Sequence, residues 1–498
     1  MTAGDTARRY RFTPIRRSGL FGALPPTLVV TLAAGVLTAW ALVITRATLP
    51  LAVAPIAAAG AVAFGRIAGR PVHEVIPVAL CWSTRILRRR HRWVRPVPLL
   101  VDGTTAQALP PALAGLTLFE ATPPGSGRTP PVGVVHDRTA GLLTAVLRVY
   151  GDGQFALADP AGQDHQVDLW GLALGAFCRE STPVARIVWH ESTSPTGIGD
   201  HAARARTRWG DEPDDPARAS YVELIDAVTP ASVRHDVLVE VTIDLRKLRT
   251  LRRRPSVQAG TEILLDEVRL FTARLEHAGL HPSLALTAVE VITITRVLSD
   301  PTTRHQLATR QRSLAAATSH AAPEFGPMAV HERWGHVQVD AVAHRSWVVA
   351  RWPRRETPAD WLGALLFGLD GTRTVTVVFE PVAPSRSDRD IDKEAVTRET
   401  NADDKARRGF RVKAVDRKAA RDVERREAEL NDGYPELAYT GLLTVTAATV
   451  DELDDLAGTV EQTAAQAGIE LRVLYASQAA GWVAGLPLGR NLARKVNP

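Results

Sequence analysis

The chain has 498 residues, of which 60 are Lys or Arg and 54 are Asp or Glu, and it contains two cysteines. This length allows two or three domains. Cys81 and Cys178 lie far apart, form no CxxC motif and are expected to be reduced. Residues 1–95 carry fourteen Arg and only two acidic residues, whereas residues 96–498 are net acidic. This division argues against a large nucleic-acid-binding face on the main part of the chain.

Two uncharged apolar segments follow the basic N-terminal residues 1–26. Thr27 to Ile44 and Ala47 to Gly65 contain eighteen and nineteen residues, and nineteen helical residues span about 28 Å, close to the hydrocarbon core of about 30 Å. We therefore expect a two-helix transmembrane hairpin over residues 27–65. Because arginines dominate both flanks, the N- and C-termini are expected in the cytoplasm, at the inner (plasma) membrane. A cleaved signal peptide and a buried helical hairpin are the alternatives.

Residues 66–95 are expected to form an Arg-rich interfacial helix, centred on Glu74 to Trp93. Its indole rings would lie at headgroup depth while its arginines face anionic lipid. An arm that binds nucleic acid is the alternative, because the same arginines suit phosphate. The candidate membrane-interface residues are Trp82, Arg85, Arg88, Arg89, Arg90, Arg92 and Trp93.

A Pro-, Gly- and Thr-rich linker, residues 96–130, leads to an expected α+β cytoplasmic domain over residues 131–328. Alternating apolar residues predict strands, and apolar residues at spacings of three and four predict helices. The expected strands are Val132 to Val135, Leu142 to Tyr150, Val184 to His190 and Val237 to Leu245. The expected helices are Gln163 to Phe177, Ala217 to Val228, Glu262 to Ala278 and Leu286 to Leu298.

Residues 329–498 are expected to form a second α+β domain of ferredoxin-like type. Its expected strands are Ser346 to Trp352, Thr372 to Phe379, Glu436 to Thr446 and Glu470 to Tyr475, and its helices are Ala359 to Leu369 and Thr449 to Ala467. A charged helical arm, residues 385–432, interrupts this pattern. Because it is polar nearly all round, the arm is either solvated or docks a partner. The fold class is therefore α+β, with a membrane hairpin in front.

The sequence predicts no active site. It contains no GxxxxGK[ST] phosphate loop and no G-x-S-x-G elbow. In the string from His331 to His336 the two histidines are five positions apart, so they cannot share one helical face as zinc ligands do. His165 and His190, each beside a carboxylate, are interpreted as exposed hydrogen-bonding groups. We expect no catalytic, cofactor-binding or metal-binding residues, and no enzymatic activity.

Several features of the layout belong together. They are Arg16-Arg17-Ser18-Gly19-Leu20-Phe21-Gly22, the apolar hairpin, the Arg-rich helix, the Leu142 to Val149 strand, and Gln478 with Leu486-Pro487-Leu488-Gly489. This layout resembles the actinobacterial integral membrane proteins of conjugation-like, type IV secretion-like gene clusters. It looks like a small membrane subunit fused to the amino-terminal half of a conjugal-transfer ATPase without its motor domain.

The resemblance implies a non-catalytic structural component of an inner-membrane export apparatus, acting as a platform for a separate ATPase. Its implied partners are the lipid bilayer, that ATPase, other membrane subunits and copies of itself, with no direct nucleic-acid binding. A membrane subunit of type VII secretion and a membrane-bound enzyme with an unrecognised site are the alternatives.

Overall fold

The protein is described by a computed structural model. The described residues are 9, 10, 12, 26–45, 49–67, 70–96, 109–123, 130–151, 155, 157–195, 216–228, 233–250, 256–304, 326–407 and 414–492.

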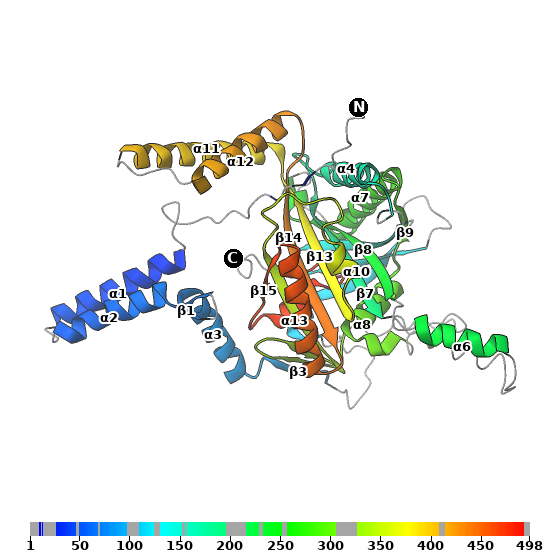
Figure 1. The fold of residues 1–498 in the computed structure, drawn as a ribbon, viewed down its shortest axis with the longest axis horizontal. Coiled ribbons are helices and arrows are strands. Elements are labelled where there is room, and N and C mark those ends of the chain that lie inside the picture. The colour runs from blue at the N-terminus through cyan, green and yellow to red at the C-terminus, as the bar shows by residue number, and fades with distance from the viewer. Residues whose placement is uncertain are drawn as a thin grey trace.

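One antiparallel sheet of thirteen strands dominates the described part of the chain (Figure 1). Its path runs β3-β10-β11-β12-β14-β13-β7-β8-β6-β5-β4, with β15 also pairing with β12 and β9 with β6. The strands are β3 (Arg92–Val94), β4 (Leu116–Ala121), β5 (Val132–Asp137), β6 (Leu142–Tyr150), β7 (Val184–Pro195), β8 (Val233–Asp244), β9 (His281–Ala285), β10 (Ala329–Glu332), β11 (Val337–Val339), β12 (Val342–Arg351), β13 (Thr372–Pro381), β14 (Leu437–Ala447) and β15 (Glu470–Val473).

The sheet consists of two units with the same topology. The first unit contains β6, α4 (Pro160–Gly175), β7, β8, α7 (Val257–His277) and β9, and the second contains β12, α10 (Gly363–Phe367), β13, β14, α13 (Val450–Gln466) and β15. Their strand orders are β9-β6-β8-β7 and β15-β12-β14-β13. Each is the 4-1-3-2 order of a ferredoxin-like βαββαβ unit. The units join where β7 pairs antiparallel with β13.

Each unit contains an equivalent backbone hydrogen bond, from which residues of the two units can be matched. Leu286, after β9, donates to Val146 O, and Leu474, after β15, donates to Ser346 O. Following the strand registers from this bond gives these equivalent pairs: Leu147 with Trp347, Val239 with Leu443, Trp189 with Val375, and His190 with Thr376. His190 and Thr376 also face each other across the β7–β13 pair. An approximate twofold axis therefore passes between these two residues.

Helices cover both faces of the sheet. On one face α4 and α7 enclose the core of the first unit around Phe177 and Phe271, and α10 and α13 enclose that of the second unit around Trp347. On the other face α8 (Ala288–Ser299) and α14 (Gln478–Ala484) pack on a third cluster that includes Trp482. Both faces are buried in the middle of the sheet, as in β6, whose first six residues are all buried.

The N-terminal hairpin is the largest correction to the sequence analysis. Helices α1 (Pro26–Ile44) and α2 (Leu49–Phe64) pack side by side and extend away from the sheet (Figure 1). Within the described ranges, no helix combines the length and the apolar character needed to cross a bilayer. Helix α2 has 16 residues, about 24 Å of helix. The predicted transmembrane hairpin, the fold class built on it and the two-span plasma-membrane location are wrong.

The segment after the hairpin also differs from the prediction. In place of one interfacial helix from Glu74 to Trp93, a small ladder of β1 (Arg66–Ile67) and β2 (Arg70–Pro71) is followed by α3 (Val72–Leu87). The helix ends at Leu87 because the chain turns at Arg89, whose φ is 52°. The chain then enters the sheet as β3, which pairs with β10.

Each unit carries a helical insertion between its second and third strands. In the first unit this is α6 (Pro216–Val228), and in the second it is α11 (Pro384–Arg407) with α12 (Ala414–Asn431). Figure 1 shows both insertions extending outward, on opposite sides of the sheet. The charged arm expected at 385–432 corresponds to α11 and α12.

Candidate functional site

Trp82 of the predicted interface packs on the body of the protein. Its ring lies 6.2 Å from Trp334 and 6.3 Å from His91, edge to face in both pairs. Trp334 in turn stacks on Tyr475 at 5.7 Å. Aromatic contacts of this kind hold two elements together, so Trp82 attaches α3 to the second unit.

Arg85 completes this attachment. Its guanidinium donates to the backbone oxygen of Ala476 at 2.8 Å and pairs with Glu332 at 3.3 Å. Glu332 is buried and also accepts from the backbone N–H of Ala479 at 3.0 Å. Burial raises the pKa of the Glu332 carboxyl, against the opposing effects of these donors. Arg85 therefore serves an internal contact.

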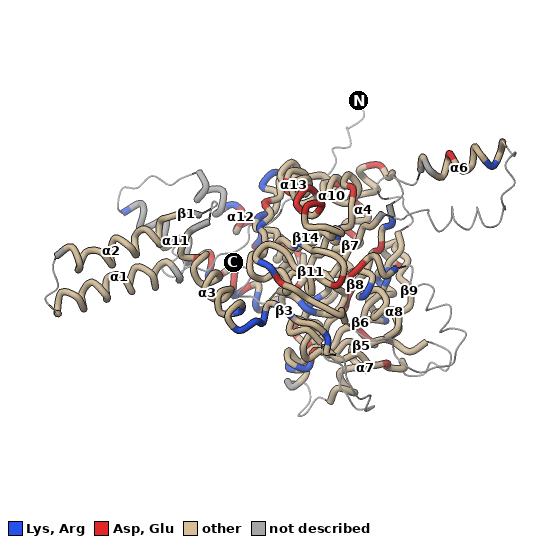
Figure 2. Tube along the Cα trace, turned by 90° about the horizontal axis from the view of Figure 1, so that it is seen from below, with Lys and Arg blue, Asp and Glu red and all other residues tan. Residues whose placement is uncertain are grey.

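The other predicted interface residues lie in two environments. Arg88, Arg89 and Arg90 are exposed in the turn after α3, whereas Trp93 packs against the core cluster under α14. Figure 2 shows Lys and Arg positions in blue at the end of α3. Arg92 is exposed, and its Nε–H donates to His331 Nε2 at 3.2 Å. Desolvation, followed by the charges of Arg333 and Arg92, lowers the pKa of His331 to about 4. The turn is thus strongly cationic, while Trp82, Arg85 and Trp93 belong to the fold.

The string from His331 to His336 does not form a metal centre in the structure. His331 contacts Arg92, and Glu332 pairs with Arg85. Across the described ranges, no three His, Cys, Asp or Glu side chains are grouped as metal ligands.

The most concentrated chemistry is a buried polar cluster on the axis between the units. We call His190, Glu240, Arg186 and Thr376 the axial cluster. His190 Nδ1 lies 2.9 Å from Thr376 Oγ1, and its Nε2 lies 3.3 Å from Glu240 Oε1. The side chains of His190 and Glu240 are each only 1% exposed. Such a cluster is stable only where every charge finds partners.

The C-terminal segment, residues 486–492, supplies partners for Glu240 and Arg186. The peptide N–H of Gly489 donates to Glu240 Oε1 at 3.2 Å, and Arg186 donates to the Gly489 carbonyl oxygen. Burial lowers the pKa of Arg186 while the nearby Glu240 raises it. Gly489 adopts φ +68°, and a Cβ there would overlap Thr144 Oγ1. The axial cluster therefore recognises the backbone of one glycine.

Neighbouring contacts fix the same segment. Arg490 donates through Nε to Asp137 Oδ2 at 2.9 Å and through its other nitrogens to the backbone oxygens of Ala112 and Ala114. Hydrogen bonds from Thr139, Ala140 and Arg490 lower the pKa of Asp137 in spite of its burial. Leu486, Leu488 and Leu492 are buried. The Leu-Pro-Leu-Gly string thus closes the face opposite α4 and α7.

Sequence reasoning missed the axial cluster. His190 was interpreted as an exposed group at the end of a strand, but β7 continues to Pro195 and buries it. The local pattern around Glu240 does not predict its burial, because a carboxylate inside a strong apolar strand has the same pattern whichever face it occupies. The one available sign was that a charged residue interrupts the apolar run from Val237 to Ile243.

The charged arm is fixed at its base and charged along its length. Ser385, at the start of α11, donates through N and Oγ to the two oxygens of Glu180 in the first unit, at 2.7 and 2.9 Å. These bonds hold the pKa of Glu180 below its ordinary value. At the other end Arg426 pairs with Glu394 and Glu436. The arm therefore projects from a defined anchor that involves both units.

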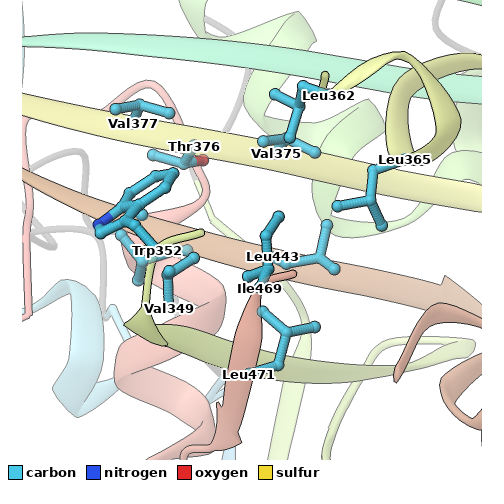
Figure 3. A pocket seen from close by; sticks show the side chains of 12 residues that line it. Val349, Trp352, Leu362, Leu365, Val375, Thr376, Val377, Leu443, Ile469 and Leu471 are labelled. Carbon is cyan, nitrogen blue, oxygen red and sulfur yellow. The ribbon is translucent and has the colours of Figure 1, made fainter. Parts of the chain in front are cut away.

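A small pocket lies in the core of the second unit (Figure 3). Its lining is almost wholly apolar, with Val349, Trp352, Leu365, Val375, Leu443 and Leu471 among the side chains around it. It offers no charged group, so it can accommodate added methyl groups but provides no acid or base for catalysis.

Comparison of the sequence with protein-family models and with curated proteins finds no match.

Proposed function

We propose that the protein is a structural component of a type IV secretion-like or conjugation-like export apparatus, in which it holds a separate ATPase. The observation that carries the proposal is the anchored arm of α11 and α12, which extends from the junction of both units (Figure 1). The likeness of the layout, including the Leu-Pro-Leu-Gly string, to the amino-terminal half of conjugal-transfer ATPases adds support.

The arm has the chemistry of a docking element for a protein. Between them α11 and α12 contain eleven basic and twelve acidic residues, a mixed pattern that gives specificity for one partner surface more than raw affinity. Ile391 and Val423 are buried within the arm, while Val396 is 63% exposed. The exposed valine, surrounded by charges of both signs, is the point at which an apolar anchor of the partner would be buried.

Affinity purification of the full chain from its own cells, followed by mass spectrometry, tests the proposal. Recovery of a conjugation-type ATPase is the expected result. Recovery of type VII components would favour the alternative assembly, and purification without an ATPase would contradict the proposal.

A pair of variants then locates the contact. Val396→Asp is expected to reduce recovery of the ATPase severalfold, because it places a charge at the apolar point of the arm. Ala395→Ser, at the neighbouring exposed position, changes neither charge nor size much and is the matched control. Equal recovery with both variants would remove the arm from the interface.

A further inference from the structure

The first described residues of the chain lie across both units on the side of α4. Tyr10 forms an isolated antiparallel bridge with Thr357, in which Tyr10 N–H donates to Thr357 O at 2.8 Å and Thr357 N–H donates to Tyr10 O at 2.9 Å. The Tyr10 hydroxyl donates to Asp164 Oδ1 at 2.9 Å. Because Asp164 belongs to the first unit and Thr357 follows β12 of the second, one residue connects the two units.

Two positions further along, Phe12 enters a set of rings in the second unit. We call Trp352, Trp361 and Tyr439 the aromatic cradle. Phe12 stacks on Trp352 at 5.2 Å and meets Trp361 at 4.8 Å and Tyr439 at 6.2 Å, edge to face. Trp352 also contacts the other two cradle rings, at 6.0 and 5.3 Å. These separations and angles are those of favourable aromatic pairs.

Room for the cradle is made by a glycine. A Cβ at Gly441 of β14 would lie 2.8 Å from the Trp352 ring and 2.7 Å from Val349. The cradle rests on the core of the second unit, against which Phe12 and Tyr439 are partly buried. The site is therefore an integral part of the folded body.

The spacing of the two aromatic residues matches an extended peptide. In a strand, side chains at i and i+2 point to the same face, so Tyr10 and Phe12 both reach the body while Arg9 is exposed. The segment itself is basic. The sequence around the two rings is Arg8-Arg9-Tyr10-Arg11-Phe12, and Asp164 provides a carboxylate on the receiving surface.

We propose that the aromatic cradle, together with Thr357 and Asp164, is a binding site for an extended basic peptide with aromatic residues at positions i and i+2. The chain's own Tyr10 and Phe12 occupy this site. Because only thirteen residues separate Phe12 from the first residue of α1, the site ties the apolar hairpin to the body. This inference does not depend on the function proposed above.

A peptide supplied from outside tests the site. Phe12→Ala in the full chain weakens the resident segment and leaves the cradle intact, since Phe12 lies outside the two units. A fluorescent peptide of residues 7–14 is expected to bind this variant saturably, by fluorescence anisotropy. It should bind the unsubstituted chain at least about tenfold more weakly, because the resident segment competes at a high effective concentration.

A register-shifted peptide is the matched control. Exchanging the residues that correspond to Arg11 and Phe12 keeps the composition and charge but moves the second ring to the other face of the strand. Its affinity for the Phe12→Ala chain should fall by about tenfold or more, which corresponds to the loss of one buried aromatic side chain. Equal binding of the two peptides, or no binding of either, would overturn the proposal.

Variants of the receiving side give an independent test. Asp164→Asn in the Phe12→Ala background should weaken the peptide with Tyr more than a peptide with Phe at that position, because only the peptide with Tyr has the hydroxyl that donates to Asp164. Equal sensitivity of both peptides to Asp164→Asn would refute the assigned pose. Thermal unfolding of each variant verifies that the body is folded.

Discussion

The two ferredoxin-like units share strand order and register but differ in what they place at equivalent positions. Glu240 of the first unit corresponds to Thr444 of the second, and Thr144 corresponds to His344. Thr444 has an uncharged partner, because its Oγ1 lies 2.9 Å from Ser346 Oγ. Glu240 instead contacts His190 and the peptide N–H of Gly489. The two units therefore share a strand order, but the polar contacts at equivalent positions depend on which segments pack against each unit.

The largest effect should come from removing the charge that distinguishes the first unit. Glu240→Ala leaves the Gly489 N–H and His190 without the carboxylate and removes the negative charge near the half-buried Arg186, and should lower the free energy of unfolding by about 3 to 5 kcal/mol. Thr444→Ala at the equivalent position removes one hydroxyl pair and should cost about 1 kcal/mol. Denaturant unfolding measures both. Equal losses would show that the charge is not what sets the units apart.

A substitution at Gly489 should disrupt the packing of the C-terminal segment, residues 486–492. Gly489→Ala combines a left-handed backbone with an overlap at Thr144, and should cost about 3 kcal/mol or more. Gly141 has nearly the same φ, +69°, but open space around its Cβ position, so Gly141→Ala should cost only about 1 kcal/mol. Thermal unfolding of the two variants separates strain from overlap. Similar losses would contradict the packing described for residues 486–492.

Acid should affect the second unit through His344. This side chain is fully buried between Thr446 Oγ1, at 2.8 Å, and Ser299 O, at 2.9 Å. Desolvation lowers the pKa of His344 to about 4. The unfolded chain therefore binds a proton at this side chain more readily than the folded protein does. The contribution to the free energy of unfolding is fully present above pH 6.5 and falls by up to about 3 kcal/mol as the pH drops towards 4.

His344→Thr, which installs the residue of the first unit, tests this origin. The variant will be less stable at neutral pH, but the part of its pH dependence between 6.5 and 4 that comes from His344 should disappear. Unfolding curves at several pH values measure the slope. An unchanged slope would assign the acid sensitivity to other groups.

The smallest effect concerns packing. Val375→Ile adds one methylene beside the apolar pocket of the second unit (Figure 3) and should stabilise the protein by about 0.8 kcal/mol. Val239→Ile, in the fully packed core of the first unit where Val239 is 1% exposed, should be neutral or destabilising. A loss of stability with Val375→Ile would mean that the pocket cannot accept the methylene.

The sequence by itself determined most of the strands and helices of the two units. The apolar and β-branched residues of Leu142 to Tyr150 and Thr372 to Phe379 lie in β6 and β13, and Thr287 with Glu290 forms a capping box at the start of α8. These features depend on neighbours a few positions away. The ferredoxin-like order was expected for residues 329–498, but its recurrence in the first unit was not.

Only the tertiary structure decided how these elements meet. The pairing of β7 with β13 and the entry of β3 into the sheet depend on partners more than a hundred positions away. The same holds for the contacts of His190 with Thr376 and of Glu240 with Gly489. Local periodicity carries no information about which strands become neighbours. The uncharged run of residues 27–65 likewise predicted a membrane hairpin. The structure gives the actual ends of α1 and α2, and within the described ranges neither helix meets the length and apolar character needed to cross a bilayer.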